Sequence, residues 1–145
     1  MEKTEKKNEC YQPVLLTAGD AVLAVAILAV AADGKLDAQE RSDLQGLLAA
    51  NQVFGKVRDA KKYMSRVSCT VAGKGRDAAL IEATGLLSPG LRETAYAWAV
   101  YMIAADRKTV SPEHKFLSLL RRRFAIHGVL AGKINAVVPM LRRSR

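Results

Sequence analysis

Apolar and polar residues alternate along the chain with the spacing of helices. The longest apolar run covers residues 15–32 and is interrupted by Asp20, and a second run covers residues 97–105. Shorter segments carry apolar residues three and four positions apart, the period of an amphipathic helix. The pattern predicts about seven helices, over residues 15–32, 38–50, 54–68, 78–87, 92–105, 112–126 and 130–142, with a loop at 71–77, a break at 88–90 and a stop at 127–128. The expected fold class is therefore all-α.

The chain also repeats itself. Asp33 and Asp106 stand 73 positions apart, and the same shift places the apolar residues 24–32 over residues 97–105. Each copy, over residues 18–48 and 91–121, contains an apolar helix, an acidic turn and an amphipathic helix. Two such hairpins can bury their faces against each other. We therefore expect one all-α domain over residues 14–145, preceded by a flexible charged leader of residues 1–13.

The composition supports closely packed helices in a cytoplasmic protein. Half of the residues are hydrophobic but only 6% are aromatic, and alanine dominates the apolar runs. The two cysteines, Cys10 and Cys69, form no CxxC pair, so neither a zinc ribbon nor a disulfide scaffold is signalled, and a reducing compartment is favoured. Residues 21–32 are the uninterrupted part of the first run, too short to cross a bilayer of about 30 Å as a helix. We expect no transmembrane segment.

The turn after the first apolar run gathers three carboxylates, Asp33, Asp37 and Glu40. Helix capping explains two of them, because Asp37 can accept hydrogen bonds from the amides that open the next helix and Glu40 follows as in a capping box. Capping does not explain Asp33, because an acid at a helix C-terminus faces the negative end of the helix dipole. Its recurrence at Asp106 indicates that something stabilises an acid at this position.

Two interpretations of Asp33 are open. In the first, the carboxylates of Asp33, Asp37 and Glu40 bind a divalent cation such as Ca²⁺ or Mg²⁺, with Asp106 and Glu113 as weaker ligand candidates in the second copy. The turn is too short to supply all the oxygens that calcium prefers, so water or the other hairpin would supply the rest. In the second, Asp33 or Asp106 caps the backbone of the partner hairpin and has a purely structural role.

Paired helical hairpins of this kind resemble the TerB-like tellurite-resistance domain. The shared features are an apolar helix that ends in Ala-Asp-Gly, an acidic or serine cap, and a glutamate seven residues after the aspartate. The resemblance covers residues 18–48 and 94–126. It implies a seven-helix fold in a bacterial cytosolic protein, linked to stress or tellurite resistance and to divalent-cation binding, with no established catalytic reaction. The second copy departs from the pattern, because Arg107 replaces the glycine and the cap residue Ser111 comes one position later.

Basic residues suggest a different function. The formal net charge is +9, and residues 115–145 contain no acid. The candidate interaction surface comprises Arg58, Lys62 and Arg66, at four-residue spacing on one predicted helix, and Arg121, Arg122, Arg123, Arg142 and Arg143. These cations can contact an acidic protein, nucleic acid or an anionic membrane surface. In the last case the protein would be peripheral to the membrane. The competing interpretation is a solvated face with cations at helix C-termini.

Motifs of catalysis do not stand out in the sequence. No Gly-rich phosphate loop follows a strand, and neither His114 nor His127 has a second His or Cys at ligand spacing. His127 is explained more simply as a cation at a helix end beside Gly128. The sequence therefore predicts a non-catalytic, TerB-like cation-binding or interaction module with a protein partner. The alternative is an adaptor or scaffold whose basic C-terminal region docks on an acidic partner without metal.

Overall fold

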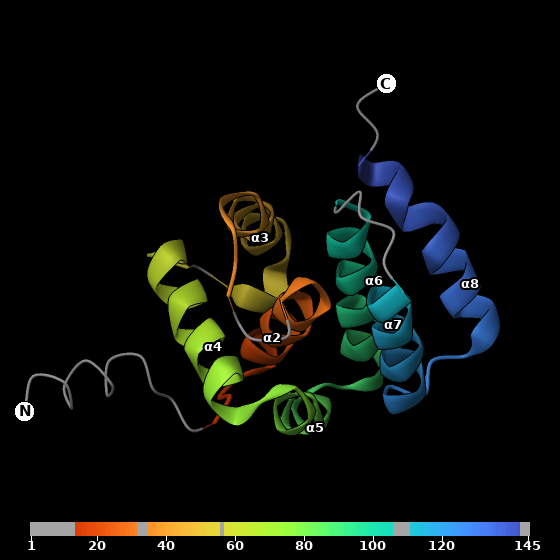
Figure 1. The fold of residues 1–145 in the computed structure, drawn as a ribbon, viewed down its shortest axis with the longest axis horizontal. Helices are drawn as coiled ribbons and strands as arrows, with labels where there is room; N and C mark the ends of the chain where they lie inside the picture. Colours follow the sequence, from red (N-terminus) through yellow and green to blue (C-terminus); the bar gives the residue numbers. More distant parts are fainter. Residues whose placement is uncertain (1–13, 32–34, 56, 106–110, 143–145) are drawn as a thin grey trace, which may run out of the picture.

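The computed structural model describes residues 14–31, 35–55, 57–105 and 111–142, with only the backbone of residues 105, 111–114 and 142 (Figure 1). These residues form seven α-helices and no strand, which confirms the all-α prediction. The helices are α2 (Ala18–Val30), α3 (Ala38–Ala50), α4 (Ala60–Lys74), α5 (Arg76–Leu86), α6 (Pro89–Ala105), α7 (Ser111–Arg123) and α8 (Gly128–Val137). Two 3₁₀ turns, η1 (Gln52–Phe54) and η2 (Val138–Arg142), complete the described chain.

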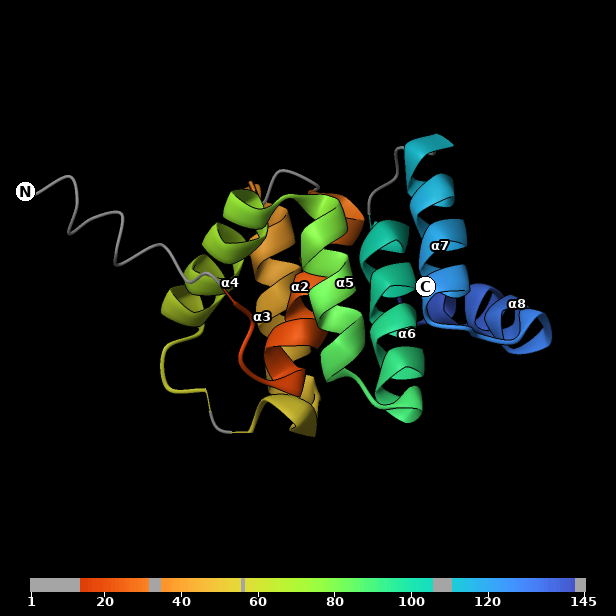
Figure 2. The ribbon, with the colours of Figure 1, turned by 90° about the horizontal axis from the view of Figure 1, so that it is seen from below.

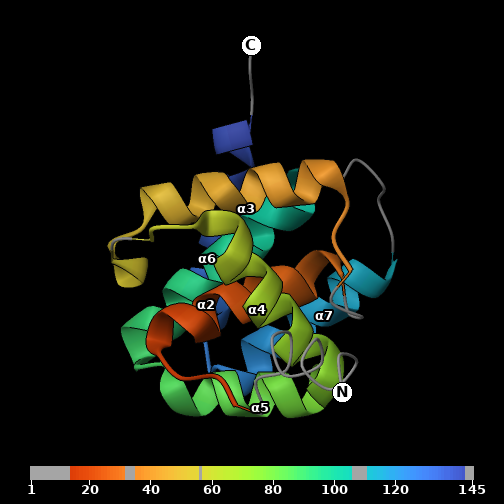
Figure 3. The ribbon, with the colours of Figure 1, turned by 90° about the vertical axis from the view of Figure 1, so that its left-hand side faces the viewer.

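Helix α2 is the centre of the fold. Its residues from Gly19 to Ala29 are all buried, because α3, α4, α5, α6 and α7 contact it from several sides. In Figure 3 it lies between α3 and α5, behind α4. The small alanine and valine side chains of α2 let these neighbours approach closely. The long apolar run is thus a core helix, as predicted, and no helix of the described residues is long and apolar enough to cross a membrane.

The two predicted hairpins correspond to α2–α3 and α6–α7. Helices α2 and α6 pack side by side, and the second helix of each hairpin also reaches the first helix of the other: α3 contacts α6, and α7 contacts α2. Figure 2 shows α4 and α5 on the α2 side of this arrangement and α8 on the α6 side. The hairpins therefore bury their apolar faces against each other. The predicted charged leader, residues 1–13, lies outside the described residues.

Two predicted loop positions are wrong. The segment 71–77 was expected to be a loop, but α4 extends to Lys74 and α5 begins at Arg76. Gly75 alone separates them, with φ at +87°. Glycine adopts this left-handed conformation without steric cost, so one residue turns the chain where a loop was expected. The predicted break at 88–90 is also shorter, because α6 begins at Pro89, a residue type well suited to the first helical position.

The connection between α7 and α8 also differs from the prediction. After α7, the amide of Ile126 donates to the carbonyl of Arg121 at 3.0 Å and Ala125 adopts φ of +53°, so a left-handed alanine ends the helix. His127 instead begins α8, because its Nδ1 accepts a hydrogen bond from the amide of Val129 at 3.2 Å. The prediction that His127 is a cation at a helix C-terminus is therefore wrong.

The expectation for the cysteines is also wrong. Cys69, on α4, is disulfide-bonded, and the other cysteine of the chain, Cys10, lies outside the described residues. The sequence gave no signal of a bond at Cys69, because this cysteine belongs to no recognised framework. The cysteines therefore do not favour a reducing compartment.

Candidate functional site

The acidic turn before α3 forms a capping box. Asp37 is the N-cap, and its Oδ1 accepts a hydrogen bond from the amide of Glu40 at 2.8 Å. Glu40 returns the interaction, because its Oε1 accepts from the amide of Asp37 at 2.9 Å. These two bonds satisfy backbone donors that a helix start leaves without partners. The capping explanation for these two carboxylates is confirmed.

The other predicted metal ligands cannot be placed beside this pair. Asp33 and Asp106 lie outside the described residues, and so does the side chain of Glu113. Among the residues that are described, no group of three or more His, Cys, Asp or Glu side chains is arranged to hold a metal ion. Metal binding therefore remains a prediction that depends on Asp33 and Asp106.

Replacement of Asp37 by alanine is expected to lower the free energy of unfolding by about 1 kcal/mol, because α3 loses its N-cap. Urea denaturation measures this loss, which should be equal with excess Ca²⁺ or Mg²⁺ and with a chelator. Glu40→Gln is the matched control, since glutamine can still accept from the Asp37 amide. A loss confined to the cation-containing samples would contradict the capping account and support a metal at this turn.

The predicted basic stripe of Arg58, Lys62 and Arg66 is interrupted at Arg66. Arg58 and Lys62 are exposed, but the guanidinium of Arg66 turns inward to the carboxylate of Asp20, with an Nη2–Oδ1 distance of 3.0 Å and an Nη1–Oδ2 distance of 3.3 Å. Asp20 lies in the first turn of α2 and is only 1% exposed. The acid that interrupts the first apolar run therefore ties α2 to α4.

Three further contacts define the Asp20 cluster. Asp20 accepts hydrogen bonds from the Tyr63 hydroxyl at 2.8 Å and from the Leu16 amide at 2.9 Å. The Arg66 guanidinium also lies over the Tyr63 ring, 5.3 Å from its centroid, in the geometry of a cation–π interaction. Both carboxylate oxygens of Asp20 are thus used inside the fold.

The charges of Asp20 and Tyr63 do not change near neutral pH. Burial raises the pKa of the Asp20 carboxyl, but hydrogen bonds from Leu16, Arg66 and Tyr63 outweigh burial and hold that pKa below its ordinary value of 3.8. Burial and the hydrogen bond to Asp20 raise the pKa of the Tyr63 hydroxyl. The acid stays ionised and the phenol stays neutral, so no group here is poised to exchange a proton with a substrate. The cluster is structural.

An apolar surface is exposed at the C-terminal end of the described chain. Helix α8 and η2 pack on α6 with one side, through residues such as Ala131, Ile134 and Val138. The opposite side consists of Val129, Lys133, Ala136, Val137, Met140 and Leu141, all exposed, and we call it the C-terminal face. Its large apolar side chains are Val129 at 61%, Val137 at 55%, Met140 at 49% and Leu141 at 70% exposure. An apolar stripe of this kind usually marks a contact surface.

Cations adjoin the C-terminal face. The last turn of α7 carries Arg121, Arg122 and Arg123, all exposed, and the Arg121 guanidinium lies against Gly128, the first residue of α8. Arg122, Arg123 and Lys133 have no ion-pair partner in the described part of the chain. The Arg142 side chain and all of Arg143 lie outside it. Apolar and basic side chains thus occur together, and residues 115–145 contain no acid.

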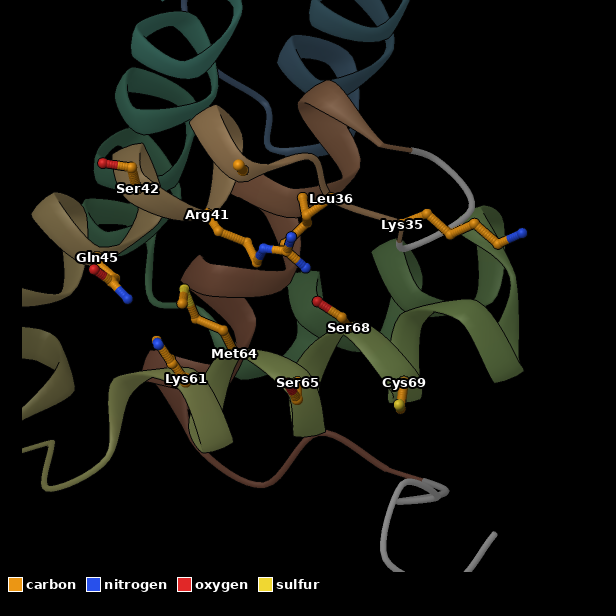
Figure 4. A pocket seen from close by; sticks show the side chains of 11 residues that line it. Lys35, Leu36, Arg41, Ser42, Gln45, Lys61, Met64, Ser65, Ser68 and Cys69 are labelled. Atoms are coloured by element: carbon orange, nitrogen blue, oxygen red, sulfur yellow. The ribbon is translucent and has the colours of Figure 1, made fainter. Parts of the chain in front are cut away.

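A cleft between α3 and α4 was not predicted. It has a volume of about 680 Å³ and is lined by residues of α3, the segment before it and α4 (Figure 4). Within the described part of the chain, its lining includes Lys35, Arg41 and Lys61 but no acidic residue. The sequence alone does not show that these cations share a cleft, because its two walls come from separate segments, residues 35–45 and 61–69.

No protein-family model, curated protein or solved structure matches the chain. The TerB-like resemblance is therefore carried by the residues of the two hairpins alone and remains a prediction.

Proposed function

We propose that this chain is a non-catalytic adaptor that docks on an anionic membrane surface through its C-terminal face. The observation that supports the proposal most is the exposure of Val129, Val137, Met140 and Leu141 on one side of α8 and η2. A helix that is apolar on both sides normally has both sides covered. In this chain α6 covers one side, and the membrane would cover the other.

An anionic lipid surface suits the C-terminal face because it can interact with both the apolar and the basic side chains. Valine, methionine and leucine side chains gain free energy when they leave water for the acyl region, and nearby Lys and Arg are attracted to anionic headgroups. Nucleic acid would use the cations but not the apolar stripe. A second copy of the chain would bring Lys133 and the arginines of both copies together, and like charges repel. An anionic lipid surface therefore fits best.

Co-sedimentation with vesicles tests the proposal. The protein is expected to pellet with vesicles of phosphatidylcholine and phosphatidylglycerol, less so as salt rises, and not with phosphatidylcholine alone. Val137→Ser/Met140→Ser should weaken binding without unfolding the protein. Arg122→Gln/Arg123→Gln should weaken it by about 30-fold, from about 1 kcal/mol for each cation.

The control variant for charge is Arg58→Gln/Lys62→Gln, which lowers the net charge equally but lies on α4 and the segment before it. It should bind vesicles nearly as the wild type does. Equal losses in both double variants would show that only net charge matters and would contradict docking by the C-terminal face. Binding to duplex DNA but not to vesicles would favour nucleic acid instead.

Divalent-cation binding of the TerB-like kind is a second proposal, supported by the recurrence of Asp33 at Asp106. Calorimetric titration of metal-stripped protein with Ca²⁺ and then Mg²⁺, beside Asp33→Asn, tests it. Saturable heat that the variant loses would support a site at the turn. No heat from folded wild-type protein would contradict one.

A further inference from the structure

The cleft between α3 and α4 has the size of a site for a small molecule. Its volume of about 680 Å³ lies within the range of about 300–1,000 Å³ that is usual for ligand pockets. One wall comes from residues 35–45 and the other from residues 61–69 of α4. No Asp or Glu of the described residues lines either wall, so these walls would repel cations and attract anions.

Two cations point into the cleft from opposite walls. In Figure 4, the Arg41 side chain points from α3 toward α4, and the Lys61 side chain points from α4 toward α3, while Lys35 points away. Arg41 and Lys61 have no ion-pair partner among the residues that the structure describes. Two uncompensated positive charges in a concave surface focus the potential on one anion.

The start of α3 adds to this potential. Ala38, the first residue of α3, lines the cleft, and a helix N-terminus carries the positive end of the helix dipole. Asp37 and Glu40 are at the same helix start, but each accepts a hydrogen bond from the backbone amide of the other. Neither of them lines the cleft.

Ser68 supplies an independent sign of a ligand. Its hydroxyl is buried in the wall of the cleft and has no hydrogen-bond partner within the described residues. An unpaired buried hydroxyl is destabilising, so its presence is explained if a bound molecule supplies the partner. Gln45 and Ser42 add polar groups, and Met64 adds an apolar surface. The lining residues that the structure describes include no aromatic ring, and therefore none on which a nucleotide base would stack.

We propose that this cleft binds a small phosphorylated sugar or polyol, with the phosphate between Arg41 and Lys61 and a hydroxyl group at Ser68. A phosphate dianion matches two cations, and the guanidinium of arginine donates to phosphate oxygens in pairs. Hydroxyl groups match the serine and glutamine side chains. Figure 1 shows α3 and α4 on the side of the molecule away from α8, so the ligand is a free metabolite and not a lipid headgroup. The choice of a free metabolite over a lipid headgroup rests on the proposed membrane docking, whereas phosphate binding in the cleft does not.

Calorimetric titration with glucose 6-phosphate and glycerol 3-phosphate tests the proposal, with inorganic phosphate and glucose as references. Saturable binding of at least one ester is expected, with weaker binding of phosphate and none of glucose. Arg41→Gln/Lys61→Gln should lose binding by at least about tenfold for each cation. Arg58→Gln/Lys62→Gln, which changes the same charge outside the cleft, should bind normally. No binding of either ester, or equal binding by both double variants, would overturn the proposal.

Ser68→Ala separates a ligand contact from a structural role. Removal of an unpaired buried hydroxyl should raise the thermal stability of the unliganded protein and weaken binding of the ester. Unchanged affinity would overturn the hydroxyl contact. Pelleting with vesicles that contain phosphatidylinositol 4-phosphate tests the lipid source. If the protein binds these vesicles through Arg41 and Lys61 but binds neither soluble ester, the assignment to a free metabolite is overturned.

Discussion

Replacement of Asp20 by alanine is expected to lower the free energy of unfolding by about 3 kcal/mol. Asp20 is 1% exposed and accepts hydrogen bonds from Arg66, Tyr63 and Leu16. Without the carboxylate, three donors lose their acceptor and Arg66 keeps a charge that is partly buried, at 28% side-chain exposure. Chemical denaturation measures the loss.

Asp77→Ala is the matched control for the Asp20 variant. Asp77 pairs with Arg76 at 3.5 Å, but their side chains are 72% and 49% exposed. Solvent screens such a pair, so its removal should cost less than about 1 kcal/mol. Similar losses for the two variants would contradict the role of Asp20 as a buried tie between α2 and α4.

The contribution of Asp20 to the free energy of unfolding should also depend on pH. Its pKa in the folded protein is below the ordinary value of 3.8, so the ionised form stabilises the fold above that value, and the contribution is lost as the pH falls through the folded pKa. The difference in unfolding free energy between wild type and Asp20→Asn should therefore shrink as the pH is lowered from neutral to below 3.8. A constant difference would show that Asp20 does not titrate as the structure requires.

Replacement of Leu23 by alanine should lower the free energy of unfolding by about 2–5 kcal/mol, because it leaves a cavity in the middle of the central helix. Leu23 is fully buried in α2. That loss is a large part of the roughly 5–15 kcal/mol that stabilises a domain. Differential scanning calorimetry should show the fall in Tm.

The control is Leu141→Ala, the same substitution at a side chain that is 70% exposed. It should change stability by no more than about 0.5 kcal/mol. A small loss at Leu23 as well would contradict the placement of α2 at the centre of the core.

Features with local causes could be predicted from the sequence. The bounds of α3 agree with the prediction because Asp37 and Glu40 form a capping box within one turn. The central position of α2 follows from an apolar run that is too long and uniform for a surface helix. The Gly75 turn was mispredicted, because a single left-handed residue and a loop look alike in sequence.

Features that join distant segments could not be predicted. The four-residue spacing of Arg66 suggested a solvated stripe, but its partner, Asp20, is 46 residues away. The cleft takes Arg41 and Lys61 from different helices. Helix α8 is apolar on both sides, and only its packing on α6 shows which side is left open.

The most direct test of membrane docking is fluorescence from Val137→Trp. Val137 lies in the C-terminal face at 55% exposure, and the one native tryptophan, Trp98, provides a background that the wild-type protein corrects. With vesicles that contain phosphatidylglycerol, emission from the new tryptophan should shift to shorter wavelengths and be quenched by a quencher on the acyl chains. If the protein binds the vesicles but the new tryptophan keeps the emission of a side chain exposed to water, insertion of the C-terminal face is contradicted.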